Sequence, residues 1–275
     1  MVFSTPVGPK GLYPDQTFQA ADVVPDALIY TITTVAGNIE GDEPAIRVPY
    51  VKTDPTVGFV PEGDPINETA PELDELVIRT GKLAVLTRQT NESATYPDAA
   101  ALNASSMARA LTIKGNTALL GNPAADAQPA GLLNIPGITD AGTLGTNLDS
   151  IGEAITSVEV AGGNATHVLV DPQTFGAIRA MKSGDGSNMP LLGAAGEQTG
   201  RTIYGVPVIV SPQMPAGTIL VIDRANIISA AGPIKLATSD AVYFDRDSLA
   251  RRATWRIGWD VLDPARIAKI SAAAA

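Results

Sequence analysis

The sequence has no cysteine, so disulfide bonds and thiolate chemistry are excluded. It has a single histidine, His167, in a strand-like segment, where histidine more often packs or faces solvent than acts as a base. It contains neither a Gly-x-Ser-x-Gly motif nor a glycine-rich phosphate loop ending in Lys-Ser/Thr. We therefore predict no catalytic residue, no cofactor and no metal site, and a protein that is not an enzyme.

Membrane-spanning segments and secretory signals are also missing. No apolar run approaches the length that crosses a bilayer, and the N-terminus lacks a basic segment followed by an apolar one. We expect a protein made in the cytoplasm without a membrane partner. Aromatic residues make up only 5% of the chain, whereas 26 glycines and 21 prolines are present. This composition predicts many turns and extended segments around modest cores.

Negative charge is concentrated in the N-terminal third. The net charge of the 275 residues is −10, and residues 1–82 alone hold 13 of the 29 acids but only 5 of the 19 bases. Residues 246–269 are locally basic, with 6 bases and 3 acids. Tight nucleic-acid binding is not expected, because counterion release needs clustered positive charge. Asp240, Asp245 and Asp247 could bind a cation, but a solvated loop is the simpler interpretation.

Residues 98–121 carry the longest helix signal. Asp98 can cap the first turn, and Gly121 can end the last one. Small and apolar residues recur at spacings of three and four and therefore share one face: Ala101, Ala104, Ala108, Leu111, Gly115 and Ala118. This face would let another backbone lie close, although a helix in an ordinary core has the same pattern.

Two β-rich segments, residues 45–51 and 75–87, flank a long acidic connection. Four prolines stiffen the connection, Pro55, Pro61, Pro65 and Pro71. It is too long for a tight turn and predicts a projecting hairpin that is stabilised by lying on a partner. Residues 1–35 before it contain four prolines, and apolar residues are scattered until residues 27–35. About the first two dozen residues are by default a disordered tail, or alternatively an arm that becomes ordered on a neighbouring subunit.

The rest of the chain mixes helix and strand patterns, which predicts an α+β fold. Helical patterns cover residues 148–162 and 172–182, and residues 122–147 resemble a loop. Strand patterns cover residues 166–171, 205–211, 218–223, 241–244, 248–261 and 265–271.

Short passages follow one another in a fixed order over residues 59–270. The most specific is Phe59-Val-Pro-Glu-Gly-Asp, followed by Leu76-Val-Ile-Arg-Thr-Gly-Lys-Leu-Ala-Val. Further passages are Thr90-Asn-Glu-Ser, Leu119-Leu-Gly-Asn, Gln128-Pro-Ala-Gly-Leu-Leu, Leu169-Val-Asp-Pro, Tyr204-Gly-Val-Pro-Val-Ile-Val-Ser, Gln213-Met-Pro and Arg252-Ala-Thr-Trp-Arg-Ile-Gly-Trp-Asp-Val-Leu-Asp-Pro-Ala-Arg-Ile. In this order they resemble the major capsid proteins of tailed bacteriophages, which have the Hong Kong 97 type of fold.

The resemblance implies a Hong Kong 97-like capsid fold with a role for each segment. These are an N-terminal arm (1–40), an extended β-hairpin loop (41–90), a peripheral domain with a long spine helix (91–129), an axial domain (130–240) and C-terminal strands of the peripheral domain (241–275). The small-residue face of the spine helix is then expected to pack against the C-terminal strands.

The resemblance also implies a viral structural protein. Such a protein self-assembles as pentamers and hexamers into the icosahedral head of the virion and encloses double-stranded DNA without sequence-specific binding. Its expected partners are further copies of itself, portal and scaffolding proteins and, as an option, a decoration protein. The alternative is an encapsulin-like shell around a protein cargo. The Glu-Gly motif of the hairpin and the length of the extended loop argue against this alternative. A soluble enzyme or binding module has no motif in its support.

The charge pattern suggests how neighbouring subunits meet. Acids of the hairpin are expected to lie against bases of a neighbour's C-terminal strand, since opposed potentials favour correct register. The acids are Glu62, Asp64, Glu68 and Glu72, with Asp74 and Glu75 beside them, and the bases are Arg246, Arg251, Arg252 and Arg256. Strand alternation places residues 251 and 252 on opposite faces. The simpler alternative is that all these charges face water.

Some members of this family join their subunits by an isopeptide bond that needs a Lys, an Asn and a catalytic Glu. The Asn position falls near Asp247 here and the Glu position near Thr254, so both groups are absent, whatever Lys52 does. We therefore predict a shell without autocatalytic cross-links. The acid that often precedes the helix-ending Leu-Gly is replaced by Asn116.

Overall fold

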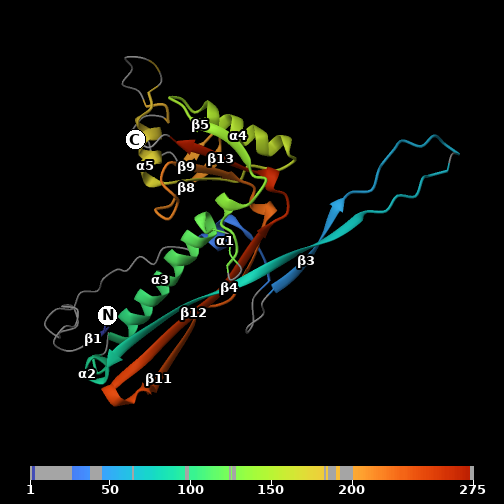
Figure 1. Ribbon diagram of the computed structural model, residues 1–275. Helices are drawn as coiled ribbons and strands as arrows, with labels where there is room; N and C mark the ends of the chain where they lie inside the picture. Colours follow the sequence, from blue (N-terminus) through green and yellow to red (C-terminus); the bar gives the residue numbers. More distant parts are fainter. Residues whose placement is uncertain are drawn as a thin grey trace.

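The computed structural model describes residues 2–3, 27–37, 45–63, 65–96, 99–123, 125, 128–182, 184, 190–192 and 201–272. In this part of the chain, the protein has two units built on β-sheets and a long hairpin that projects away from both (Figure 1). Helices and strands are mixed along the chain, which confirms the α+β class.

The first unit is built on a seven-stranded sheet in the order β1-β4-β12-β10-β2, with β11 beside β12 and β3 beside β4. Its strands are β1 (Val2–Phe3), β2 (Thr34–Gly37), β3 (Ala45–Thr53), β4 (Glu72–Thr90), β10 (Ile227–Ala231), β11 (Lys235–Tyr243) and β12 (Ser248–Val261). β4 and β12 pair antiparallel from Ser248 opposite Thr90 to Gly258 opposite Thr80. The first part of β4 pairs with β3 instead and forms the hairpin.

Helix α3 (Ala99–Gly121) lies along one face of this sheet (Figure 1). The helix predicted over residues 98–121 is confirmed, although Asp98 lies outside the described residues. Its buried positions recur every four residues, at Asn103, Met107, Leu111, Gly115 and Leu119. The predicted stripe is wrong in its first half, because Ala101 is exposed and Ala108 is only half-buried. Alanine is favoured throughout helices, so its spacing alone does not locate the buried face.

Gly115 is the point of closest approach between α3 and the sheet. A Cβ atom there would lie 2.4 Å from the ring of Trp255 on β12, so only glycine lets the ring reach the helix backbone. The indole N–H of Trp255 donates to the Gly232 carbonyl at 2.8 Å, and that of Trp259 donates to the Ala130 carbonyl at 2.6 Å. The expected packing of the helix on the C-terminal strands is confirmed here.

Residues 27–37 are part of the body of the protein, although the prediction placed them in an N-terminal arm. Helix α1 (Leu28–Ile32) buries Leu28, Ile29 and Ile32 in the same core as α3. The backbone N–H of Leu28 donates to the side-chain oxygen of Asn116 on α3 at 2.9 Å. Most of the remaining predicted arm lies outside the described residues.

The second unit contains a six-stranded sheet in the order β5-β13-β9-β6-β8-β7. Its strands are β5 (Thr139–Leu144), β6 (His167–Val170), β7 (Thr202–Ile203), β8 (Val206–Val210), β9 (Thr218–Ile222) and β13 (Ile267–Ala272). Helices α4 (Asp149–Val160) and α5 (Pro172–Ala180) pack on this sheet through Ile151, Val158, Phe175 and Ile178. Both helices lie where the sequence predicts them.

Five described strands occur where no strand is predicted, the short β1, β2 and β7 and the longer β5 and β10. β5 lies in the segment interpreted as a loop, because Thr-Asp-Ala-Gly-Thr-Leu lacks an apolar alternation. β10 is entirely buried, but three of its five residues are Ser or Ala, so the sequence lacks the run of large apolar residues that indicates a buried strand. β11 is also longer than the predicted segment 241–244 and begins at Lys235.

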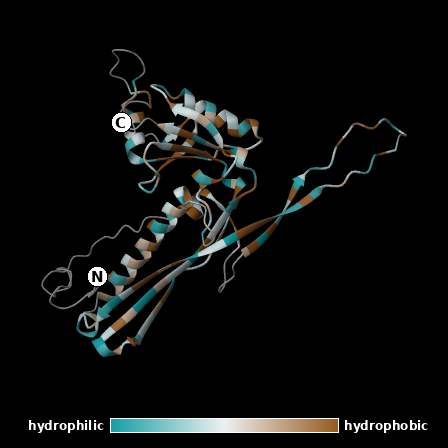
Figure 2. Ribbon diagram, in the orientation of Figure 1, coloured by the Kyte–Doolittle hydropathy of each residue, from teal (hydrophilic) through white to brown (hydrophobic). Residues whose placement is uncertain are grey.

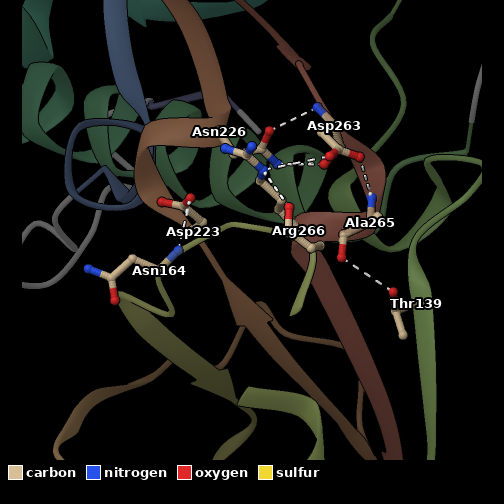
Figure 3. A network of polar contacts seen from close by, with 8 residues as sticks. Thr139, Asn164, Asp223, Asn226, Asp263, Ala265 and Arg266 are labelled. Atoms are coloured by element: carbon tan, nitrogen blue, oxygen red, sulfur yellow. Dashed lines mark hydrogen bonds and ion pairs between the residues drawn. The ribbon is translucent and has the colours of Figure 1, made fainter. Parts of the chain in front are cut away.

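The two units are joined by hydrogen bonds around Asn226 (Figure 3). Its side-chain amide donates to the Asp263 carbonyl at 2.7 Å, and its side-chain oxygen accepts from the Asp263 N–H at 2.8 Å. The short helices η2 (Arg224–Asn226) and η4 (Pro264–Arg266) carry the chain from β9 to β10 and from β12 to β13. β10 thus belongs to the first sheet and β13 to the second, so the predicted division at residue 240 does not follow the sheets.

Three short helices complete the described secondary structure: α2 (Asn91–Ala94), η1 (Leu132–Asn134) and η3 (Phe244–Arg246). η3 forms the connection between β11 and β12. No helix in the described ranges is both long and apolar enough to cross a membrane.

Candidate assembly surfaces

The hairpin formed by β3 and β4 exposes large apolar side chains away from both cores. The strands pair antiparallel, with Ile46 opposite Ile78 near the base. At the tip, Phe59 is fully exposed, Val57 is 91% exposed and Ile66 is 80% exposed. Figure 2 shows hydrophobic positions, in brown, along this projecting hairpin. Burial of each such side chain would contribute about 1.5–3 kcal/mol, so the tip is suited to covering by another molecule.

The predicted acids lie along the same hairpin. Glu62 and Glu68 are exposed at the tip, whereas Asp64 lies outside the described residues. Glu72 opens β4, and its carboxylate lies 3.8 Å from Nζ of Lys52 on β3. Exposed ion pairs of this kind contribute only about 0.2–1 kcal/mol. The structure therefore groups Glu62 and Glu68 with the exposed apolar residues of the tip.

The predicted bases do not form one surface. Arg252 and Arg256 lie on the face of β12 that points away from α3. Arg251 shares the opposite face with Trp255, which packs toward α3, and this confirms the predicted alternation. Arg246 lies apart in η3, where it pairs with the neighbouring Asp245. Only Arg252 and Arg256 can therefore act together on a partner.

The side of the first sheet opposite α3 is a basic face. Strand register brings five bases of β4, β11 and β12 onto it: Lys82, Arg88, Lys235, Arg252 and Arg256. Leu86 lies among them and is 57% exposed. Where β4, β11 and β12 pair with one another, the described positions on this face carry no acid, and Asp260 follows on the same face of β12 where that strand pairs with β10. The basic face thus offers positive charge around an apolar centre.

Two of these bases are held in place by neighbouring side chains. A guanidinium N–H of Arg256 donates to Thr80 Oγ1 at 2.8 Å. The guanidinium of Arg88 lies 5.7 Å from the ring centroid of Tyr243, within the range of a cation–π interaction. Both contacts orient the charge along the sheet, which makes the face better ordered than a set of free surface side chains.

Sequence reasoning missed three of the five bases on this face. Lys82, Ala84, Leu86 and Arg88 stand at every second position of β4, so the sequence shows that they share one face of the strand. The missing information is which strands lie beside one another and in what register. A count of charges near the C-terminus therefore finds Arg252 but not Lys82.

A cavity of ≈ 470 Å³ lies where β4 leaves the first sheet, and Arg79, Trp259 and Asp260 are among its lining residues. Gly258 marks this crossing, because a Cβ atom there would lie 2.4 Å from the carbonyl oxygen of Arg79. Burial raises the pKa of the Asp260 carboxyl, although a hydrogen bond from the Val261 N–H opposes the effect. The hairpin leaves the sheet at this crossing, so its direction depends on the absence of a side chain at Gly258.

The lone histidine has no catalytic surroundings. His167 is half-buried, and its burial, together with the charge of Arg224, lowers its pKa. Its Nδ1 lies 3.2 Å from Thr166 Oγ1. In the ranges that the structure describes, no three acids or histidines gather as metal ligands would, and Asp245 and Asp247 are exposed.

Comparison with protein families gives one match over most of the chain. The model of the phage capsid family matches residues 27–272. The comparison with curated proteins gave no match.

Solved structures with a similar fold include several capsids. The capsid of a native GTA particle, computed with C5 symmetry, is 22% identical, with a TM-score of 0.74 over 98% of both chains. The structure from Gordonia phage Cozz is 20% identical, with a TM-score of 0.73 over 91% of this chain and 87% of that one. The structure from Mycobacterium phage Bobi is 15% identical, with a TM-score of 0.70 over 94% and 96%.

Proposed function

Because the chain belongs to the phage capsid family, we propose that it is the major capsid protein of a tailed bacteriophage. Its fold is of the Hong Kong 97 type, as the sequence predicts. In the proposed head, the protein assembles as pentamers and hexamers into an icosahedral shell around double-stranded DNA. It acts there as a structural component and catalyses no reaction.

The observation that carries this proposal is the projecting hairpin with its exposed apolar tip. A two-stranded hairpin is marginal in water on its own, and clustered exposed apolar residues mark interaction sites. Within a shell, each tip is covered by the next subunit, so that Phe59 and Ile66 gain the burial that they lack in one chain.

We place the tip of one subunit on the basic face of a neighbour. Glu62 and Glu68 of the tip would meet Arg252 and its neighbouring bases, and Phe59 would meet the exposed Leu86. The opposed charges would select the correct register more than they would add affinity. This contact revises the sequence-based pairing, because Arg251 points toward α3 and Arg246 lies apart.

The proposal also fixes the expected partners and location. The subunit contacts other copies of itself, portal and scaffolding proteins and, as an option, a decoration protein on the outside. It is made in the host cytoplasm and resides in the virion. A net charge of −10 suits a container that holds DNA without gripping it.

Electron microscopy of the purified protein tests the proposed function. Closed icosahedral shells, filled with DNA when isolated from infected cells, are the expected result. Shells that hold a protein cargo would favour the encapsulin-like alternative. Small monodisperse particles under all assembly conditions would contradict both.

Charge reversal tests the contact between tip and basic face. Arg252→Glu should lower the yield of shells, because it sets an acid against Glu62 and Glu68. Lys114→Glu is the matched control, since this exposed base lies on α3 and makes the same change in net charge. Equal shell yields from the two variants would reject the contact.

A further inference from the structure

The second unit has two surfaces that are complementary to each other. A closed ring of identical subunits needs two different patches on each copy, one for each neighbour. α4 and α5 pack in one hydrophobic cluster on the second sheet, and Figure 1 shows α5 toward one end of this unit and α4 toward the other. We propose that α4 of one subunit docks on α5 of the next and that this contact closes the ring. The inference rests on the proposed assembly into pentamers and hexamers.

Charge is divided between the two sides already in the sequence. No Lys or Arg occurs between Lys114 and Arg179. The acids in this stretch are Asp126, Asp140, Asp149, Glu153, Glu159 and Asp171. The next bases are Arg179, on α5, and Lys182, just after it; Asp185, Glu197 and Arg201 come further along the chain. α4 itself therefore carries the acids Asp149, Glu153 and Glu159 and no base, whereas the bases Arg179 and Lys182 lie on α5 and just after it.

The α4 surface combines acids with projecting apolar side chains. Its outward positions recur at helical spacing, at Asp149, Glu153, Thr156 and Val160. Val160 is 83% exposed, and Tyr204, from the turn between β7 and β8, is 61% exposed beside it. These residues line a groove of ≈ 770 Å³. Apolar side chains rimmed by acids suit a partner that is basic and has small residues at its centre.

Tyr204 is held in a fixed position on this surface. Its φ of 50° lies in the left-handed region that side chains other than glycine rarely adopt. Its ring rests on α4, 3.5 Å from where a Cβ atom of Gly152 would lie. The ring therefore projects from a tight turn and packs against the backbone of α4 at Gly152, where no side chain intervenes.

The α5 surface has the opposite character. Its exposed positions Gly176, Ala177 and Ala180 are small, and a Cβ atom on Gly176 would meet no described atom within 4 Å. The guanidinium of Arg179 lies 4.4 Å from the ring centroid of Phe175, which holds the charge close to the helix. Lys182 follows and is exposed. A flat surface beside two bases can accept the projecting residues of α4 and pair with its acids.

A charge swap tests this contact in the full chain. Glu153→Lys and Arg179→Glu should each lower the yield of shells about tenfold, because each places like charges opposite one another. The double variant restores the opposition and should recover most of the yield. Lys114→Glu serves as the control for charge reversal outside the contact. Single variants that assemble normally, or a double variant that assembles no better than the singles, would overturn the proposal.

A steric variant separates docking from folding. Gly176→Leu replaces the poorest non-proline helix former, so the unfolding temperature of dissociated subunits should rise or stay unchanged. The leucine fills the flat surface and should still lower the yield of shells. Normal assembly of this variant would overturn the proposal. If the unaltered protein forms no shells at all, the proposed function itself fails, which is a distinguishable result.

Discussion

Gly115 sets the distance between α3 and the first sheet. The Trp255 ring occupies the space that a side chain on Gly115 would need, and the indole N–H of Trp255 is fixed by the Gly232 carbonyl. The ring therefore cannot move aside without losing a buried hydrogen bond.

Replacing Gly115 with valine should therefore destabilise the subunit by about 1–3 kcal/mol, because the new atoms overlap the ring. Denaturant unfolding of dissociated subunits measures this loss. Gly58→Val is the control, since a Cβ atom there would meet no described atom within 4 Å. A control that loses as much stability as Gly115→Val would show that the Trp255 contact is not the cause.

The stability of the subunit should depend on pH because of Asp260. Burial raises the pKa of its carboxyl above the ordinary value of 3.8, so the folded state holds the proton more tightly than the unfolded state. Burying the charged carboxylate therefore lowers the free energy of unfolding. This destabilisation is present above the raised pKa and disappears as the pH falls below 3.8. Asp260→Asn should raise the unfolding temperature at neutral pH, because Asn removes the charge and keeps an acceptor for the Val261 N–H.

The stability gain of Asp260→Asn should shrink as the pH falls toward 3.8. Thermal unfolding of dissociated subunits between pH 7 and pH 3.5 gives this comparison. A gain that is equal at both ends of the range would mean that burial of the charge is not responsible.

Individual residues differ in how far the sequence predicts them. The opposite placement of Arg251 and Arg252 follows from strand alternation, which depends on local sequence alone. The role of Asn116 could not be predicted, because its partner Leu28 is 88 residues away. The buried face of α3 was only half predicted, since Asn103 and Met107 replace the expected alanines there.

Among the elements, the hairpin is the one that a single subunit does not bury. Its ladder ends with Thr53 paired to Glu72, and the tip lies beyond this pair. All three hydrophobic clusters of the described residues consist of residues outside the tip. We therefore expect the tip to serve the proposed assembly without being needed for folding of the subunit.

Truncation separates these two roles. Replacing residues 54–71 by Asn-Gly joins Thr53 to Glu72 through a two-residue turn that suits a hairpin. The subunit should keep its unfolding temperature, whereas the yield of shells should fall to the background level. Sedimentation and calorimetry of the same preparation measure both quantities. Normal shells from the truncated chain would show that the tip is not needed for assembly.

Elements with strong local patterns were predicted well, and those that depend on neighbours were not. α3 and β12 have long, regular patterns, and the structure has both within one residue of the predicted bounds. β5 and β10 lack such patterns and form because β13 and β12 lie beside them. The basic face likewise arises only when β4, β11 and β12 are placed side by side.

For the whole molecule, we expect the proposed shell to be held together by non-covalent contacts. Asp247 stands at the expected Asn position and accepts a hydrogen bond from Asn91 Nδ2 at 2.5 Å, while Thr254 supplies no carboxylate. We therefore expect mature shells to dissolve into single subunits on a denaturing gel without reducing agent. A ladder of covalent multimers would refute this prediction.

Our main proposal is that the hairpin tip is covered by another subunit in the shell. Cryo-electron microscopy of assembled shells tests it most directly, at a resolution that traces side chains. We expect Phe59 to be buried on the basic face of a neighbour, close to Leu86 and Arg252. Closed shells in which the tip extends into solvent, or in which the basic face stays uncovered, would contradict it.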